Sequence, residues 1–208
     1  MTTLLVPSRT DVSKVRTGLD RLLNRSSDTS VDISSYLDPD KAYARDRFDR
    51  LQPNDPHEIS PSDLLAVTLL DLSTPIDFLT QLLSPSYGGA GRLDALLRDV
   101  PTNVPLWNAT DADLRAADAA WNVINGIHGV GWVRAGKLMA RKRPLLIPIW
   151  DTVVRSFFGE PTAVWASFRE VLRDDRLRER LWTLAPADWP QDMSLLRLVD
   201  IAAWMYRR

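Results

Sequence analysis

Apolar residues recur at intervals of three and four along almost the whole chain, and no clear run alternates strictly between apolar and polar residues. This period matches the turn of an α-helix, whereas a half-buried strand alternates at every second residue. One such stripe is formed by Val12, Val15, Leu19, Leu22 and Leu23. We therefore predict an all-α fold.

The same pattern, together with helix-start residues, places the expected elements. Ser60 has the character of an N-cap, followed by Pro61 in the first turn and by Asp63, which the helix dipole favours. Further helices are expected over residues 41–51, 63–72, 73–83 and 111–124, and at about 151–158, 162–173, 176–184 and 194–206. Loops are expected over 26–35 and 88–91. We expect one helical domain over residues 1–208, with room for two lobes.

Composition excludes several classes of protein. The chain of 208 residues has no cysteine, which excludes disulfides, iron–sulfur clusters and thiolate zinc sites and is compatible with a reducing cytoplasm. With His57 and His128 as the only histidines, a histidine-rich metal site is not expected. The N-terminal residues lack the pattern of a signal peptide, and no apolar run is long enough to span a membrane. We expect a cytoplasmic monomer with no membrane contact.

Basic residues are concentrated in one segment. The formal net charge of the chain is −1, so affinity for nucleic acid requires a local patch. Residues 129–155 contain six basic residues and one acidic residue, Asp151. The basic residues are Arg134, Lys137, Arg141, Lys142, Arg143 and Arg155. We predict that this segment forms the basic patch.

A pair of glycines lies between two expected helices. Gly129 and Gly131 permit backbone angles closed to other residues, and helix-forming sequence resumes at Trp132. The free N–H groups of a helix start bind anions, so a DNA phosphate could dock on the amides near Gly131 and Val133. Arg134 and Lys137 would support that contact. The alternative is an ordinary helix corner whose glycines only permit close packing.

Asp151 follows an extended apolar segment that contains Pro148. Proline disfavours helix at Ile147, so a helix is expected to restart at Asp151. One interpretation is a structural N-cap, worth about 1 kcal/mol. The other is a carboxylate facing a groove, where it could stabilise positive charge on a sugar or orient water. The two roles are compatible, because a capping aspartate is held rigidly.

The segment Gly126–Arg155 resembles the core of the helix-hairpin-helix DNA glycosylase superfamily. The similar residues are Ile127-His128-Gly129-Val130-Gly131, then Ala135, Pro148 and Asp151-Thr152-Val153-Val154-Arg155. The resemblance covers about 30 of the 208 residues. Two positions depart from the family pattern: His128 replaces the usual proline, and Ile149 and Trp150 separate Pro148 from Asp151 where one residue is typical.

The resemblance implies a set of site residues. Asp151 would be the catalytic carboxylate, and the amides around Gly129, Gly131 and Val133 would hold phosphate. Backbone carbonyls of Asn125, Ile127 and Val130 would bind a monovalent cation, with no other cofactor required. Val133 occupies the position of the lysine nucleophile of bifunctional members, so no strand-cleaving activity is expected.

The function expected from this resemblance is that of a monofunctional DNA glycosylase. The enzyme would bind double-stranded DNA, flip a damaged or modified base and hydrolyse its N-glycosidic bond, leaving an abasic site. Trp150, Tyr43 and Phe48 could flank the flipped base, although core packing is the alternative role for each. One hypothesis for the substrate is a bulky modified base of phage DNA, which would make this a defence protein.

Two other functions remain open. The chain could be a non-catalytic helix-hairpin-helix module that binds DNA or a protein, particularly if the additional residue before Asp151 shifts its carboxylate out of register. It could also be a helical interaction protein that binds no nucleic acid. Asp151→Asn separates the first alternative from an enzyme, and neutralising Arg134 and Lys137 tests the second.

Overall fold

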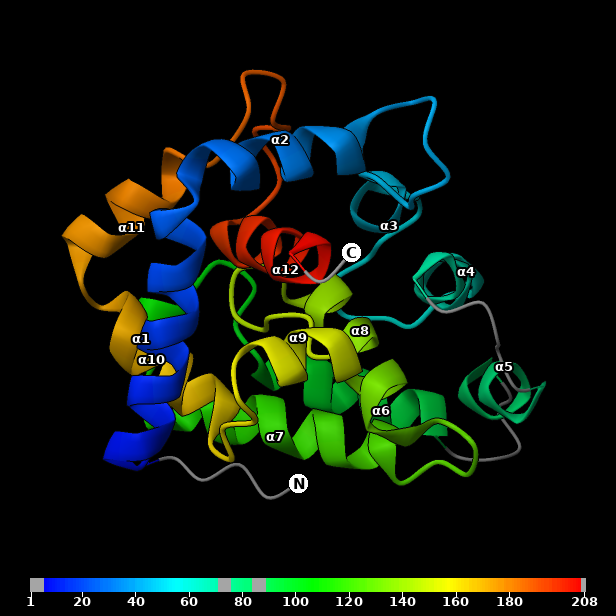
Figure 1. Cartoon of the computed structure of the whole chain (residues 1–208). Helices are drawn as coiled ribbons and strands as arrows, with labels where there is room; N and C mark the ends of the chain where they lie inside the picture. Colours follow the sequence, from blue (N-terminus) through cyan, green and yellow to red (C-terminus); the bar gives the residue numbers. More distant parts are fainter. Residues whose placement is uncertain (1–5, 71–75, 84–88, 207–208) are drawn as a thin grey trace.

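The computed structural model describes residues 6–70, 76–83 and 89–206, and regular structure in these residues is helical (Figure 1). This confirms the all-α prediction. The elements are α1 (Arg9–Asn24), α2 (Ser26–Leu37), α3 (Arg47–Arg50), α4 (Pro61–Leu69), α5 (Ile76–Leu83), α6 (Gly89–Asp99), the short 3-10 helix η2 (Leu106–Asn108), α7 (Asp111–Asn125), α8 (Gly131–Lys142), α9 (Thr152–Phe157), α10 (Val164–Leu172), α11 (Asp175–Trp182) and α12 (Leu195–Met205).

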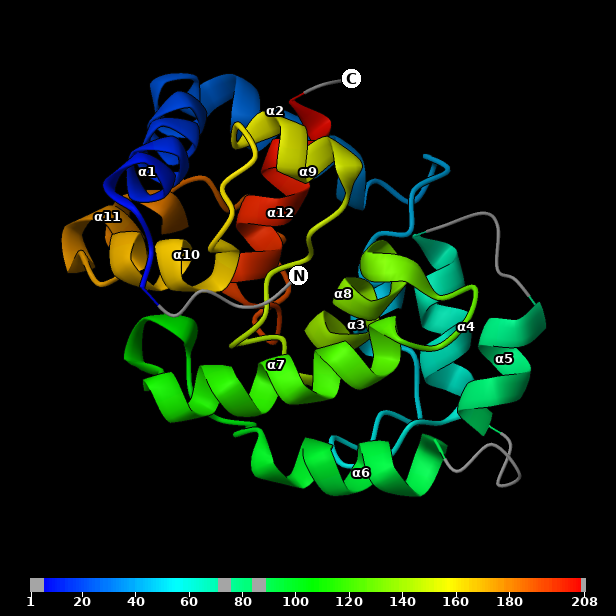
Figure 2. The ribbon, with the colours of Figure 1, turned by 90° about the horizontal axis from the view of Figure 1, so that it is seen from below.

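The helices pack as two groups. In the first group, α12 contacts α1, α2, α9 and α11, and α10 packs against α1. In the second group, α7 packs against α6 and α8, while α4 contacts α3, α5 and α8. Figure 2 shows the two groups side by side, with the chain passing from α8 in one group to α9 in the other. Contact between α10 and η2 also joins them.

Helix α12 is the centre of the first group. Among its residues only Trp204 is more than slightly exposed, and even its two charged residues, Arg197 and Asp200, are buried. A helix that is apolar nearly all round is expected to be covered on every side. Two charges inside such a helix therefore need partners in the surrounding elements.

Most predicted helix starts are confirmed. Ser60 and Asp63 form a capping box at the start of α4, and Thr110 and Asp113 form another at the start of α7. Of the extended segment predicted before Asp151, residues 147–150 have no helical structure but Leu145 and Leu146 lie in a turn, and α9 begins directly after Asp151 as predicted.

Three predicted elements are corrected. Residues 26–35, predicted to be a loop, belong to α2, because Thr29, Ile33 and Tyr36 recur at helical spacing and are buried. The helix predicted over 41–51 is reduced to α3, and Arg45 just before it has a left-handed φ of 56°, which a continuous helix cannot contain. Of the break predicted over 88–91, residues 89–91 are instead the first residues of α6, and residue 88 lies outside the described residues. Residues 71–75, including the predicted helix start at Ser73, lie outside the described residues.

Across the ranges 6–70, 76–83 and 89–206, no helix has the length and apolar character needed to cross a membrane.

Candidate active site

Asp151 is the N-cap of α9. Its Oδ1 accepts hydrogen bonds from the backbone N–H groups of Val153 at 3.0 Å and Val154 at 2.9 Å. The structural interpretation of this residue is therefore confirmed. Within the described part of the chain, Oδ2 accepts no hydrogen bond. The cap thus fixes the carboxylate while leaving one of its oxygens for another contact.

Asp151 also lines a cavity of about 270 Å³ at the junction of the two helix groups. One side of the cavity is lined by Tyr36 of α2 and by residues 42–44 of the loop that follows α2. The end of α4 contributes Leu69 and Leu70. Helix α12 contributes four lining residues, Arg197, Asp200, Ile201 and Trp204, and Ile149 lines the cavity together with Asp151. A junction between packed units is a common position for a ligand site.

Three aromatic rings gather at this cavity. The rings of Tyr36 and Tyr43 stack with centroids 5.5 Å apart, and Trp204 meets both edge-on at 6.1 Å and 5.8 Å. Tyr36 is buried, whereas Tyr43 and Trp204 are half-exposed. Because Tyr36 already covers one face of Tyr43, a planar ligand would contact the remaining surfaces of Tyr43 and Trp204.

A second carboxylate, Asp200, shares the cavity with Asp151. Arg197 donates one hydrogen bond to Asp200, another to Asp49 at 3.0 Å and a third to the hydroxyl of Tyr36 at 3.0 Å. The guanidinium also lies over the rings of Tyr36 and Phe48, at 5.6 Å and 5.2 Å from their centroids. One guanidinium is therefore divided between two carboxylates, buried Asp200 and half-buried Asp49.

The surroundings of Asp200 change its acidity. Burial raises the pKa of Asp200 to about 7, and the negative charge of Asp151 adds to this effect while Arg197 opposes it. Burial also raises the pKa of Asp49, against the opposing effect of the same arginine. The charges of Asp49 and Asp200 together raise the pKa of Arg197, so this guanidinium stays charged, although its own burial acts in the opposite direction. Asp200 can consequently hold or release a proton near neutral pH, which is the property required of a general acid.

The predicted hairpin is a tight turn over residues 126–130, exposed at Gly126, His128 and Gly129 but buried at Val130, and it joins two helices that pack against each other. Gly129 and Gly131 have left-handed φ values of 79° and 68° and are both exposed, which agrees with the conformational reason for expecting glycine there. Val133 and Arg134 are half-buried on the first turn of α8. The amides near Gly131 are thus at the surface, where an anion could reach them.

The geometry of the turn disfavours the predicted cation site. The carbonyl of Ile127 accepts from the N–H of Val130 at 3.1 Å, and the carbonyl of Val130 accepts from Arg134 Nη1 at 3.4 Å. A guanidinium beside one of the three proposed ligands would repel a second cation, and the cation site at Asn125, Ile127 and Val130 stays a prediction. In residues 6–70, 76–83 and 89–206, histidine and carboxylate side chains form no cluster suited to a metal ion.

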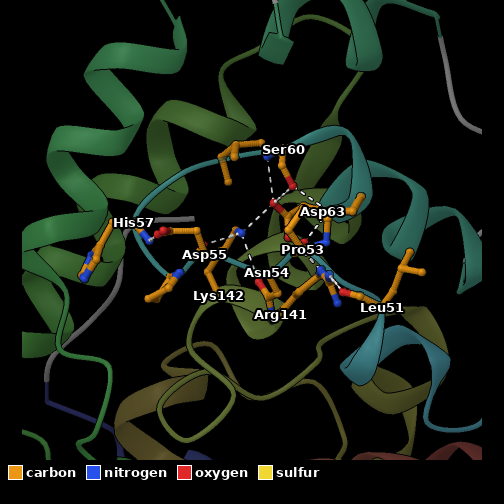
Figure 3. Close-up of polar contacts among 12 residues, drawn as sticks. Leu51, Pro53, Asn54, Asp55, His57, Ser60, Asp63, Arg141 and Lys142 are labelled. Atoms are coloured by element: carbon orange, nitrogen blue, oxygen red, sulfur yellow. Dashed lines mark hydrogen bonds and ion pairs between the residues drawn. The ribbon is translucent and has the colours of Figure 1, made fainter.

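The predicted basic patch is wrong for four of its six residues, because Lys137, Arg141, Lys142 and Arg143 are buried. Lys137, predicted to contact phosphate, donates from Nζ to the carbonyl of Leu70 at 2.6 Å. Figure 3 shows Arg141 and Lys142 converging on Asp63, with distances of 2.8 Å from Arg141 Nε and 2.6 Å from Lys142 Nζ. Exposed Arg155 pairs with Glu160 at 2.8 Å.

Of the three predicted base-pocket residues, only Tyr43 lines the cavity with Asp151. Trp150 packs against Phe158 and Phe168 in the core, and Phe48 is buried under Arg197, so the core-packing alternative holds for both. Sequence analysis missed Asp200 and Arg197. The signal available was their i, i+3 spacing inside the otherwise apolar segment LLRLVDIAAWM.

Residues 30–207 match the model of a family of unknown function, DUF6308, and the chain belongs to that family. The chain matches no curated protein and no solved structure.

Proposed function

We propose that this protein is a monofunctional DNA glycosylase that removes a flipped base by hydrolysing its N-glycosidic bond. The observation that supports this proposal most is the cavity that Asp151 shares with Asp200, Tyr43 and Trp204. It combines a rigidly held carboxylate, a second carboxylate with a pKa of about 7 and aromatic surface. Those are the groups that base extrusion and glycosidic hydrolysis require.

In this proposal the two helix groups are the lobes of a glycosylase fold, and α7, the turn 126–130 and α8 form the helix-hairpin-helix motif. The exposed amides near Gly129 and Gly131 bind a phosphate next to the flipped nucleotide. The base enters the cavity at the junction of the lobes and stacks on Tyr43 and Trp204. The cavity volume of about 270 Å³ is close to the lower limit of about 300 Å³ for small-molecule sites.

The chemistry divides between the two carboxylates. As the bond between the sugar carbon and the base nitrogen breaks, its electron pair leaves with the base, and protonated Asp200 donates a proton to that base. Asp151 stabilises the positive charge that develops on the sugar and accepts a proton from the water that attacks it. The products are the free base and an abasic site.

The chain offers no lysine suited to strand cleavage at the expected place. Val133 occupies that position, and the ammonium of Lys137, one turn further along α8, is buried and bound to the carbonyl of Leu70. The reaction therefore stops at the abasic site.

The test is abasic-site formation in a panel of alkylated, oxidised, deaminated and cytosine-modified phage DNAs, with alkali revealing the products. Asp151→Asn should lower base release by about 10²- to 10³-fold, because asparagine keeps the cap but carries no charge. Asp174→Asn is the matched control, since Asp174 also caps a helix, α11, but lies outside the cavity. Equal base release by both variants would contradict the proposal.

A non-catalytic binding module is the second candidate, and one observation favours it. Asp151 already has a complete structural role as the cap of α9, so its presence needs no reaction. This candidate predicts that wild-type protein binds duplex DNA in a salt-dependent manner but releases no base from any DNA in the panel. It also predicts that the Asp151→Asn variant binds DNA with the same affinity as wild-type protein.

A further inference from the structure

A second, larger hollow lies between α1 and the C-terminal end of α9. Its volume is about 570 Å³, and it is lined by Arg9, Lys14 and Arg21 from α1 and by residues 156–159. Hydroxyl groups of Thr10, Ser13, Thr17 and Ser156 lie among them. No carboxylate lines it, in contrast to the cavity that contains Asp151. We call this hollow the α1–α9 groove.

Two of the three cations of the groove are held by neutral backbone carbonyls, although the charge of Lys14 also acts on Asp11, whose pKa it helps to lower. Lys14 Nζ donates to the backbone carbonyl of Glu160 at 3.3 Å, and Arg21 Nη1 donates to that of Phe157 at 3.3 Å. Within the described ranges, none of Arg9, Lys14 and Arg21 forms an ion pair. The carboxylate of Glu160 pairs instead with Arg155. A cation held by neutral carbonyls leaves its attraction for an external anion intact.

Arg21 is also held in place before any ligand arrives. Its guanidinium lies 5.2 Å from the centroid of the Phe157 ring, in addition to its hydrogen bond to the carbonyl of that residue. Such contacts reduce the side-chain entropy that binding an anion would otherwise cost. The groove therefore has a fixed positive group at one end.

The spacing along α1 suits a repeating anion. From Arg9 to Arg21 the helix rises roughly 18 Å at about 1.5 Å per residue. A DNA strand carries one negative charge per roughly 3.4 Å of helix axis, so several consecutive phosphates fit this length. Serine and threonine hydroxyls commonly donate to phosphate oxygens between such cations, as Ser13 and Thr17 could do here.

The groove is connected to the candidate active site through α9. Asp151 caps the start of this helix and lines the cavity, while Ser156 and Phe157 at its end line the groove. Six helical residues span roughly 9 Å, a distance that a bound strand, with one charge per roughly 3.4 Å of helix axis, covers in a few nucleotides. In Figures 1 and 2, α9 lies between α1 on one side and α8 on the other.

We propose that the α1–α9 groove binds the sugar–phosphate backbone of the DNA strand whose nucleotide enters the cavity at Asp151. This inference rests on the proposed function, from which it takes the identity of the polyanion. The groove, rather than the buried residues Lys137, Arg141, Lys142 and Arg143 of the predicted basic patch, then makes the main electrostatic contact with DNA. The turn at 126–130 then contacts the backbone at the other end of α9.

The test measures binding of a short fluorescent duplex containing a stable abasic-site analogue, at several salt concentrations. The variant is the triple substitution Arg9→Gln, Lys14→Gln and Arg21→Gln. A plot of log K against log salt concentration has a negative slope, and each lost phosphate contact makes it less steep by about 0.9. Losing three contacts should therefore reduce the steepness by about 2.7 and weaken binding at 0.15 M salt roughly a hundredfold. The matched control is Arg92→Gln, Arg98→Gln and Arg115→Gln, which removes three exposed arginines from α6 and α7. The control should bind as wild type does.

The outcomes separate this inference from the proposed function. If the groove triple variant binds with wild-type affinity and slope, or if wild-type protein shows no salt-sensitive binding, the inference is wrong. Base release that depends on Asp151 but is unaffected by the groove substitutions leaves the proposed function standing alone. Loss of binding in the groove variant, together with no base release by wild-type protein, supports the groove and contradicts the glycosylase.

Discussion

The protein buries two clusters of charged residues, and they differ in how their carboxylates are satisfied. In the Asp63 cluster, both carboxylate oxygens are bound, Oδ1 by Arg141 and Oδ2 by Lys142 and Ser60 (Figure 3). In the Asp200 cluster, Arg197 is shared with Asp49, and the cluster opens onto the cavity that Asp151 lines. The first cluster has more cations than anions, and the second has more anions than cations.

This difference distinguishes a structural cluster from a candidate catalytic one. The donors of Arg141 that face away from Asp63 bind the carbonyls of Phe48 and Leu51, so the guanidinium also joins α8 to α3 and its C-cap. Nothing in that arrangement is left for a ligand. Asp200, by contrast, has a pKa near neutrality because its single guanidinium partner does not fully offset burial. Excess negative charge next to a cavity is how a proton donor is maintained near pH 7.

The largest expected effect comes from Asp63→Asn. It leaves Arg141 and Lys142 buried without a counter-charge, which should lower the free energy of unfolding by about 3–5 kcal/mol. Asp200→Asn should cost much less at neutral pH, because Arg197 keeps Asp49 as a partner. Equilibrium urea denaturation of both variants measures the difference. A larger loss for Asp200→Asn than for Asp63→Asn would remove the distinction between the clusters.

The next effect concerns activity. Asp200→Asn should lower base release by about 10²- to 10⁴-fold, the usual contribution of a positioned general acid. In wild-type protein the rate should fall as pH rises above about 7, since Asp200 then loses its proton. The variant should lack this limb of the pH–rate profile. Persistence of both the rate and the limb in Asp200→Asn would assign the ionisation to another group.

Sequence patterns predicted the helices well where the packing face was apolar and the helix start was capped. The starts of α4, α7 and α9 are determined by Ser60, Thr110 and Asp151, whose side chains bond to backbone within three residues. Such local contacts are visible in sequence. Helix α2 was missed because its serine-rich composition concealed a narrow buried face that packs against α12 and α1.

Charge was the property that sequence predicted least well. The run Arg141-Lys142-Arg143 has the composition of a nucleic-acid contact, yet its donors bind carbonyls distant in sequence, such as those of Val100 and Asp55. Buried loop carbonyls need donors, and long cationic side chains can supply them. Which basic residues meet such loops depends on tertiary structure. The same limit hid Asp200, whose role depends on the cavity that α12, α2 and the segment before α9 enclose together.

A smaller effect follows from linkage between protonation and folding. The pKa of Asp200 is about 7 in the folded protein and about 4 in the unfolded chain. At pH values between these two, the folded state therefore binds more protons than the unfolded state. Stability from this group is therefore lost as pH rises through that window. From pH 5 to pH 8, wild-type protein should lose on the order of 2 kcal/mol relative to Asp200→Asn. Parallel pH dependence of the two proteins in urea denaturation would contradict the raised pKa.

The smallest effects come from removing one hydroxyl beside each cluster. Ser60→Ala deletes a hydrogen bond to Asp63, and Tyr36→Phe deletes the one that Arg197 donates to the Tyr36 hydroxyl. Each should cost about 1 kcal/mol in the free energy of unfolding. Only Tyr36→Phe should also shift the pH midpoint of base release, because it changes the partners of the guanidinium that faces Asp200. If Ser60→Ala moves that midpoint equally, the two clusters are coupled and the Asp63 cluster is more than a structural support.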